Sequence, residues 1–118
     1  MKNNSFGLPE DILRTVKDKK LGYSLYKSLL LNYGKRGEKA FFYLREKRVK
    51  RYRDFFVVVG KEEYIVEENY CSCKDFQINL KSRKPCAHII AVKLADKMGL
   101  YDYVDFYYVD FIKKKRMG

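Results

Sequence analysis

The sequence predicts an α+β fold in which N-terminal helices precede a β-hairpin and a strongly apolar final helix. Apolar residues recur at helical spacing up to about residue 48. Residues 52–68 are rich in aromatic and β-branched side chains, which favour strands. Residues 86–98 again show a wide apolar face, bounded by a glycine. With 118 residues and 47% hydrophobic content, the chain fits one domain with a modest core.

The N-terminal helices are predicted within residues 1–37, which we assign to an N-terminal helical extension. A first helix begins at residues 8–11, where a proline and two acids suit the first turn. A break is expected at residues 20–22, and the apolar stripe then continues to Gly34, a plausible helix end. Residues 34–37 are interpreted as a basic turn, followed by a third helix over residues 38–48. The apolar residues on these helices include Ile12, Val16, Leu25 and Leu29.

The second predicted unit, residues 38–99, contains the hairpin and the final helix. Residues 52–59 are predicted as one strand, residues 60–62 as the turn and residues 63–68 as the returning strand. Residues 74–85 are polar and are expected to form a loop. The helix over residues 86–98 is expected to stop at Gly99.

All three cysteines and the only histidine lie within residues 71–88, as Cys-x-Cys, twelve residues, then Cys-x-His. Zinc prefers four thiolate or imidazole ligands in a tetrahedron. Alternate residues on a strand point to the same side, so Cys71 and Cys73 can converge on one ion. A helix N-terminus at the second pair favours thiolate over thiol. The pattern predicts one structural zinc ion (Zn2+) held by Cys71, Cys73, Cys86 and His88.

Other interpretations of these four residues are weaker. Cysteine is often only a small buried hydrophobic residue, but chance does not readily gather all four residues in so short a segment. A catalytic Cys–His pair needs a third group to orient it, and the sequence nominates none. A catalytic zinc keeps one position open, which four protein ligands do not leave. We therefore expect a protein that is not an enzyme.

The segments around the ligands resemble the SWIM zinc finger. They read CSCKDF at residues 71–76 and PCAHIIAV at residues 85–92, and that family carries Cys-x-Cys-x(n)-Cys-x-His. The upstream strands at residues 53–59 and 64–66 match as well, so the resemblance covers about residues 38–98. One departure is Ala87, at a position where a basic residue is common. The resemblance implies a ββα zinc finger core.

The resemblance also implies a class of function. SWIM domains are DNA-binding or protein-interaction modules, found in transposase-related proteins, chromatin remodelling enzymes, ubiquitin ligases and small partners of recombinase paralogues (the Shu-complex type). This chain is most similar to the last group. By that analogy we expect an accessory factor in homologous recombination or DNA repair, with a recombinase-like protein partner.

Cysteine usage and hydropathy indicate the compartment. An odd number of cysteines suits a disulfide framework poorly, whereas a reducing cytoplasm keeps thiols available as metal ligands. No apolar run approaches the ~20 residues that a membrane helix needs. We therefore expect a cytoplasmic protein without a membrane partner.

The formal net charge of +11 favours polyanionic partners. Most of the excess lies in residues 35–53, where aromatic residues stand among cations that can neutralise phosphates. The alternative is a solvated helix flank, with Tyr52 and Phe55 in the core. A smaller basic cluster lies in the loop between the ligand pairs. The candidate residues for sequence-independent binding of nucleic acid, taken to be DNA, are Lys35, Arg36, Lys39, Arg45, Lys47, Arg48, Lys50, Arg51, Arg53, Lys81, Arg83 and Lys84.

Residues 100–118 form an aromatic and acidic segment with a basic tail, and the pattern favours neither helix nor strand over residues 100–112. Exposed aromatic residues are typical interface anchors. The segment can pack on the N-terminal helices, on a recombinase-like partner or on a second copy in a homodimer. A purely protein-binding adaptor without nucleic-acid binding is therefore the alternative function. The candidate interface residues are Tyr101, Tyr103, Phe106, Tyr107, Tyr108 and Phe111.

Overall fold

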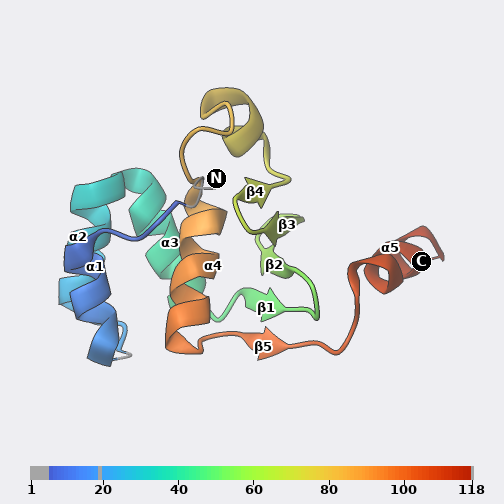
Figure 1. Ribbon diagram of the computed structural model, residues 1–118, viewed down its shortest axis with the longest axis horizontal. Helices are drawn as coiled ribbons and strands as arrows, with labels where there is room; N and C mark the ends of the chain where they lie inside the picture. Colours follow the sequence, from blue (N-terminus) through green and yellow to red (C-terminus); the bar gives the residue numbers. More distant parts are fainter. Residues whose placement is uncertain (1–5, 19, 118) are drawn as a thin grey trace.

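The computed structural model describes residues 6–18 and 20–117, and its elements form three layers (Figure 1). Helix α4 (Ala87–Met98) lies in the middle layer. Helices α1 (Glu10–Thr15), α2 (Tyr23–Tyr33) and α3 (Lys35–Arg45) lie on one side of it. A five-stranded sheet lies on the other side. The predicted α+β class and the helix after the strands are confirmed.

The sheet has the order β4-β3-β2-β1-β5. All neighbouring pairs are antiparallel except β1 and β5, which run parallel. The strands are β1 (Val49–Arg51), β2 (Phe56–Val59), β3 (Glu63–Glu67), β4 (Tyr70–Cys71) and β5 (Asp102–Tyr103). The turn at residues 60–62 connects β2 to β3, as predicted.

The prediction of one strand over residues 52–59 is wrong, because a tight turn divides that segment. Tyr52 donates its backbone N–H to the carbonyl of Phe55 at 2.8 Å, so the chain reverses between β1 and β2. Both aromatic rings are buried and stack on each other, with ring centroids 4.6 Å apart. Aromatic residues lie in a turn here, and not in a strand, because the side chains of this turn are buried.

The predicted basic turn at residues 34–37 is also wrong, and the third helix does not span 38–48. Only Gly34 lies outside a helix, with φ at 62°, and α3 begins at the next residue and ends at Arg45. Gly37 lies inside α3, where it allows close contact with α2. A Cβ atom at this position would lie 2.1 Å from the carbonyl oxygen of Leu29. The boundary placed after residue 37 therefore falls within a helix.

The main core surrounds α4. Ile89, Ile90, Leu94 and Ala95 are almost fully buried, because α4 contacts helices on one side and strands on the other. A helix covered on several sides is apolar around most of its circumference. Gly99 ends α4 in the left-handed conformation, with φ at 71°. The same cluster contains residues of α1 and α2 together with the three cysteines, so the N-terminal helices and the ligand region share one core.

A second, smaller apolar cluster, the outer cluster, lies on the sheet face away from α4. It consists of Tyr52, Phe55 and Val57, with Val104 and Ile112 packed against it from the C-terminal segment. Residues 100–112 are neither one helix nor one strand: β5 is followed by an irregular stretch and then by α5 (Tyr108–Met117). Helix α5 lies at the opposite end of the molecule from α1 and α2 (Figure 1). None of the helices in the described residues is long and apolar enough to cross a membrane.

Candidate metal centre

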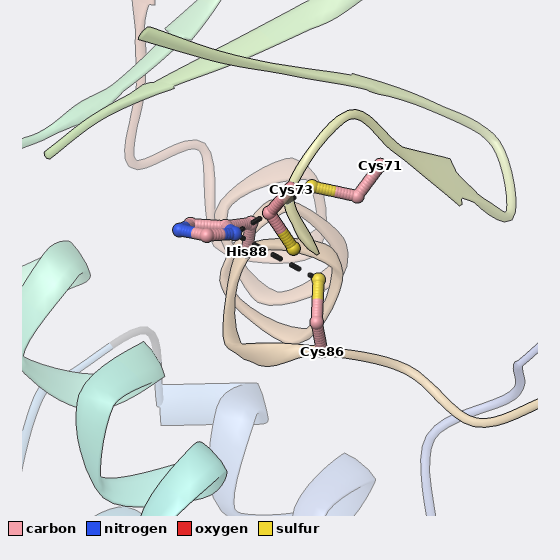
Figure 2. Close-up of side chains that lie close together, drawn as sticks. All are labelled: Cys71, Cys73, Cys86 and His88. Atoms are coloured by element: carbon pink, nitrogen blue, oxygen red, sulfur yellow. Dashed lines mark hydrogen bonds between the residues drawn. The ribbon is translucent and has the colours of Figure 1, made fainter. Parts of the chain in front are cut away.

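Four buried side chains converge where β4 and the start of α4 meet (Figure 2). Cys71 ends β4 and Cys73 follows two residues later, while Cys86 directly precedes α4 and His88 lies in its first turn. Two segments separated by a loop thus bring their ligands to one point. The sheet contact of β4 and the core packing of α4 hold these two segments in place.

The spacing of the ligand atoms fits a tetrahedral zinc ion. The three sulfur atoms and one imidazole nitrogen all lie within 4.8 Å of one another. His88 Nδ1 lies 3.5 Å from Cys71 Sγ and 3.8 Å from Cys86 Sγ. In a tetrahedron with zinc–sulfur bonds of ~2.3 Å, neighbouring ligand atoms are ~3.5–3.8 Å apart. The donor set and its spacing therefore support one structural zinc ion with four protein ligands.

The cysteines interact with one another and with backbone amides. Hydrogen bonding with Cys71 lowers the pKa of Cys86 to about 4, and the backbone N–H of Ile89 contributes to that shift. The same hydrogen bond, together with burial, raises the pKa of Cys71 well above its usual range. Cys73 Sγ accepts a hydrogen bond from the backbone N–H of Phe76 at 3.3 Å. Zinc binds cysteine as thiolate, so a bound ion displaces the thiol protons of this cluster.

The imidazole of His88 is oriented by two tyrosines. With Nδ1 toward the sulfurs, Nε2 faces the hydroxyl of Tyr43 at 3.3 Å. Metal ligation through Nδ1 leaves the proton on Nε2, which then donates to the Tyr43 oxygen. Tyr64 of β3 stacks on the ring, with centroids 4.2 Å apart. Neither Tyr43 nor Tyr64 was predicted to contact the metal ligands.

The loop between the two ligand pairs is anchored to the helical layer. It contains one π-helical turn (Asp75–Asn79), and Phe76 in this turn is buried in the main core. Asp75 accepts two hydrogen bonds from Arg36 of α3, both at 2.8 Å. These hydrogen bonds lower the pKa of Asp75 to about 2. Asp75 and Phe76 belong to the CSCKDF segment that carried the family resemblance, although their structural roles were not predicted.

The structure separates the candidate nucleic-acid-binding residues into two groups. Four arginines are paired: Arg36 with Asp75, Arg48 with Glu46, Arg51 with Asp96 and Arg53 with Asp105. Arg45 lies over the ring of Phe42 at 4.6 Å. The candidate lysines form no ion pair with any acid of the described residues, and Arg83 is exposed in the zinc loop.

Strand geometry divides the basic stretch between two faces of the sheet. Lys50 pairs with Val57, which belongs to the outer cluster, so Lys50 faces away from α4. Arg51 lies on the other face, where it reaches Asp96 of α4 at 3.3 Å and the hydroxyl of Tyr101 at 3.3 Å. Lys35 and Lys39 lie on α3, beside the metal site. The basic residues thus do not form one continuous face.

The aromatic candidates near the C-terminus differ in exposure. Tyr101 is half-buried against Phe56. Tyr108 packs edge-on against Phe55, and its backbone N–H donates to Asp54 at 2.9 Å. Tyr103, Phe106, Tyr107 and Tyr108 are all exposed. The side chain of Phe111 lies outside the described residues.

Comparison with known proteins agrees with this geometry. The SWIM zinc finger family matches residues 55–97. An uncharacterized protein of Archaeoglobus fulgidus is 62% identical over 97 residues, which cover 80% of this chain and 86% of the relative. No solved structure matches. The chain therefore belongs to one family with the Archaeoglobus fulgidus protein and carries a SWIM zinc finger.

Proposed function

We propose that this zinc-stabilised protein is a binding module, not an enzyme, and that it binds the phosphate backbone of DNA without sequence preference. One observation carries the proposal. The ion pairs between described residues all use arginine, so none of the candidate lysines is held in an ion pair with a described acid. Unpaired cations bind phosphates and release the counterions around them, which makes affinity independent of sequence but dependent on salt.

Salt-dependent DNA binding tests this proposal. Zinc-loaded protein is titrated into labelled single-stranded and duplex DNA of two unrelated sequences, with fluorescence anisotropy as the readout. If ~4–6 phosphates are contacted, log K should fall with log salt at a slope of roughly −3 to −5, shallower for the single strand. RNA of the same sequence is the control for the kind of nucleic acid. No binding at low salt, or affinity that differs strongly between sequences, would contradict the proposal.

A protein-interaction role is the second candidate, and the exposed aromatic residues of the C-terminal segment favour it. Tyr103 is 56% exposed and Tyr107 is 49% exposed, which is more than a packed C-terminus requires. Aromatic residues of this kind anchor protein interfaces. A homodimer or a recombinase-like protein would cover them, and the SWIM family makes an accessory role in recombination the natural setting. The molar mass of the protein in solution tests the homodimer directly.

A further inference from the structure

A groove of about 450 Å³ opens between α3 and the first turn of α4, directly beside the zinc ligands. This volume lies within the ~300–1,000 Å³ that is typical of ligand pockets. Two zinc ligands form part of the wall, so a molecule in the groove would contact the metal centre's own side chains. The lining residues are Lys35, Arg36, Lys39, Tyr43, Asp75, Cys86, Ala87 and His88.

One face of α3 supplies the polar groups of this groove. Lys35, Lys39 and Tyr43 are spaced four residues apart, and residues at this spacing lie above one another on a helix. The face ends at Tyr43, whose hydroxyl meets His88 Nε2. Two flexible ammonium groups and one hydroxyl therefore line the same wall and lead toward the metal centre.

The charges of the groove leave a positive excess at its lysines. Arg36 is matched by Asp75, so this pair contributes little net charge. Three thiolates and one neutral imidazole give the zinc centre a single net negative charge. Lys35 and Lys39 are both on the groove wall, and neither forms an ion pair with a described acid, although Lys39 lies close enough to Asp75 to help lower the pKa of that carboxyl. Their combined charge exceeds that of the zinc centre, which favours an anionic ligand.

The available hydrogen bonds match a phosphate group. Each lysine ammonium has three donors, and phosphate offers several acceptor oxygens. With the metal on His88 Nδ1, Tyr43 accepts the hydrogen bond from Nε2–H, so its own O–H has no acceptor among the described hydrogen bonds and can donate to a ligand. Ala87 occupies the wall between the two zinc ligands, and its small side chain leaves room beside them.

We propose that this groove is a phosphate-binding site in which Lys35 and Lys39 hold the anion and Tyr43 couples it to the zinc ligand His88. The phosphate can belong to a nucleic-acid strand, in which case the inference rests on the proposed function and names where one phosphate is held. It can also belong to a free nucleotide. The competing role for the two lysines is to offset the negative charge of the zinc centre without binding any ligand.

The double substitution Lys35→Ala/Lys39→Ala tests the site in the zinc-loaded full chain. Its matched control is Lys27→Ala/Lys61→Ala, which removes the same charge from exposed positions on α2 and in the β2–β3 turn. The probes are a twelve-residue thymidine oligonucleotide and thymidine 5′-monophosphate. We expect the groove variant to lose affinity for the oligonucleotide on the order of tenfold, with a salt slope shallower by about 1–2. The control should lose less than about threefold, because long-range attraction is largely screened by salt.

Backbone amide signals provide the second readout. Both probes should shift the signals of Ala87 and His88 in the wild type and leave them unchanged in the groove variant. Equal losses of oligonucleotide affinity in the groove variant and the control would overturn the groove site and leave the proposed function intact. A groove variant that binds zinc more weakly but binds both probes normally would also overturn it, in favour of the charge-offset role.

The two probes separate failure of the groove site from failure of the proposed function. If the wild type does not bind the oligonucleotide, nucleic-acid binding is wrong. The monophosphate then decides the groove: shifts at Ala87 and His88 that depend on Lys35 and Lys39 would support a nucleotide site. The absence of such shifts would overturn the groove site as well.

Discussion

Gly37→Ala tests the close contact between α2 and α3, the contact that also positions the basic face of α3. An added Cβ would lie 2.1 Å from the carbonyl oxygen and 2.6 Å from the carbonyl carbon of Leu29. Normal contacts of carbon atoms are ~3.5 Å, so the helices would have to separate by about 1 Å. Overpacking typically costs ~1–3 kcal/mol, and a backbone neighbour places the cost toward the upper end.

Helix propensity opposes this cost, because alanine is favoured over glycine inside a helix by ~1 kcal/mol. The net effect expected for Gly37→Ala is therefore a destabilisation of about 1–2 kcal/mol. For a domain of this size, that corresponds to a thermal midpoint lower by about 4–8 °C. Thermal denaturation of the zinc-loaded protein, followed by circular dichroism, measures it.

Gly7→Ala is the matched control, because a Cβ at Gly7 would meet nothing within 4 Å. Its midpoint should stay close to that of the wild type. A Gly37→Ala midpoint equal to or above the wild type would refute the reasoning. It would show that α2 and α3 adjust without cost and that propensity alone decides the stability at this position.

Three further predictions concern the metal centre and the C-terminal segment. Elemental analysis should find about one zinc per chain, and removing it with a chelator should unfold the region around Cys71 and His88, because structural zinc can contribute ~10 kcal/mol or more; unchanged thermal stability would contradict this. Tyr43→Phe removes the acceptor of His88 Nε2–H and should weaken zinc binding by about tenfold in a chelator competition, whereas Tyr23→Phe on exposed α2 should leave it unchanged. Deleting residues 104–118 exposes the outer cluster and should lower the thermal midpoint without changing the number of chains per particle; a change from dimer to monomer would instead assign the segment to self-association.

Much of the fold follows from local pattern. The α+β class, the helix after the second ligand pair and the turn at residues 60–62 were all predicted from periodicity and glycine positions, because short-range preferences dominate there. The errors fell where tertiary packing overrode those preferences. Gly37 was interpreted as part of a turn because glycine usually marks one, but here it allows two helices to touch. Tyr52 and Phe55 were assigned to a strand, although a packed turn buries them.

The metal centre was predictable because all four ligands lie in one short segment whose residue types and spacing suit zinc. Residues that orient the ligands lie elsewhere in the chain. Tyr43 and Tyr64 reach His88 only because α3 and β3 both pack near the start of α4. The spacing of Lys35, Lys39 and Tyr43 does show one helix face, and this signal could have marked the groove. Recognising it requires knowing that α3 begins at Lys35.

The sequence by itself determined the chemistry of this protein: the zinc ligands, the positive charge and the elements that carry them. These depend on residue identity and on spacing along the chain, which local geometry converts directly into structure. Only the tertiary structure decided which cations remain available to bind an anion. Four arginines form ion pairs: Arg36, Arg48, Arg51 and Arg53. The acid is near in the sequence for one of these pairs and far away for the other three. Lys35 and Lys39 instead border a groove beside the zinc site. Pairing of charges depends on which surfaces the core brings together, and one-dimensional spacing does not contain that information.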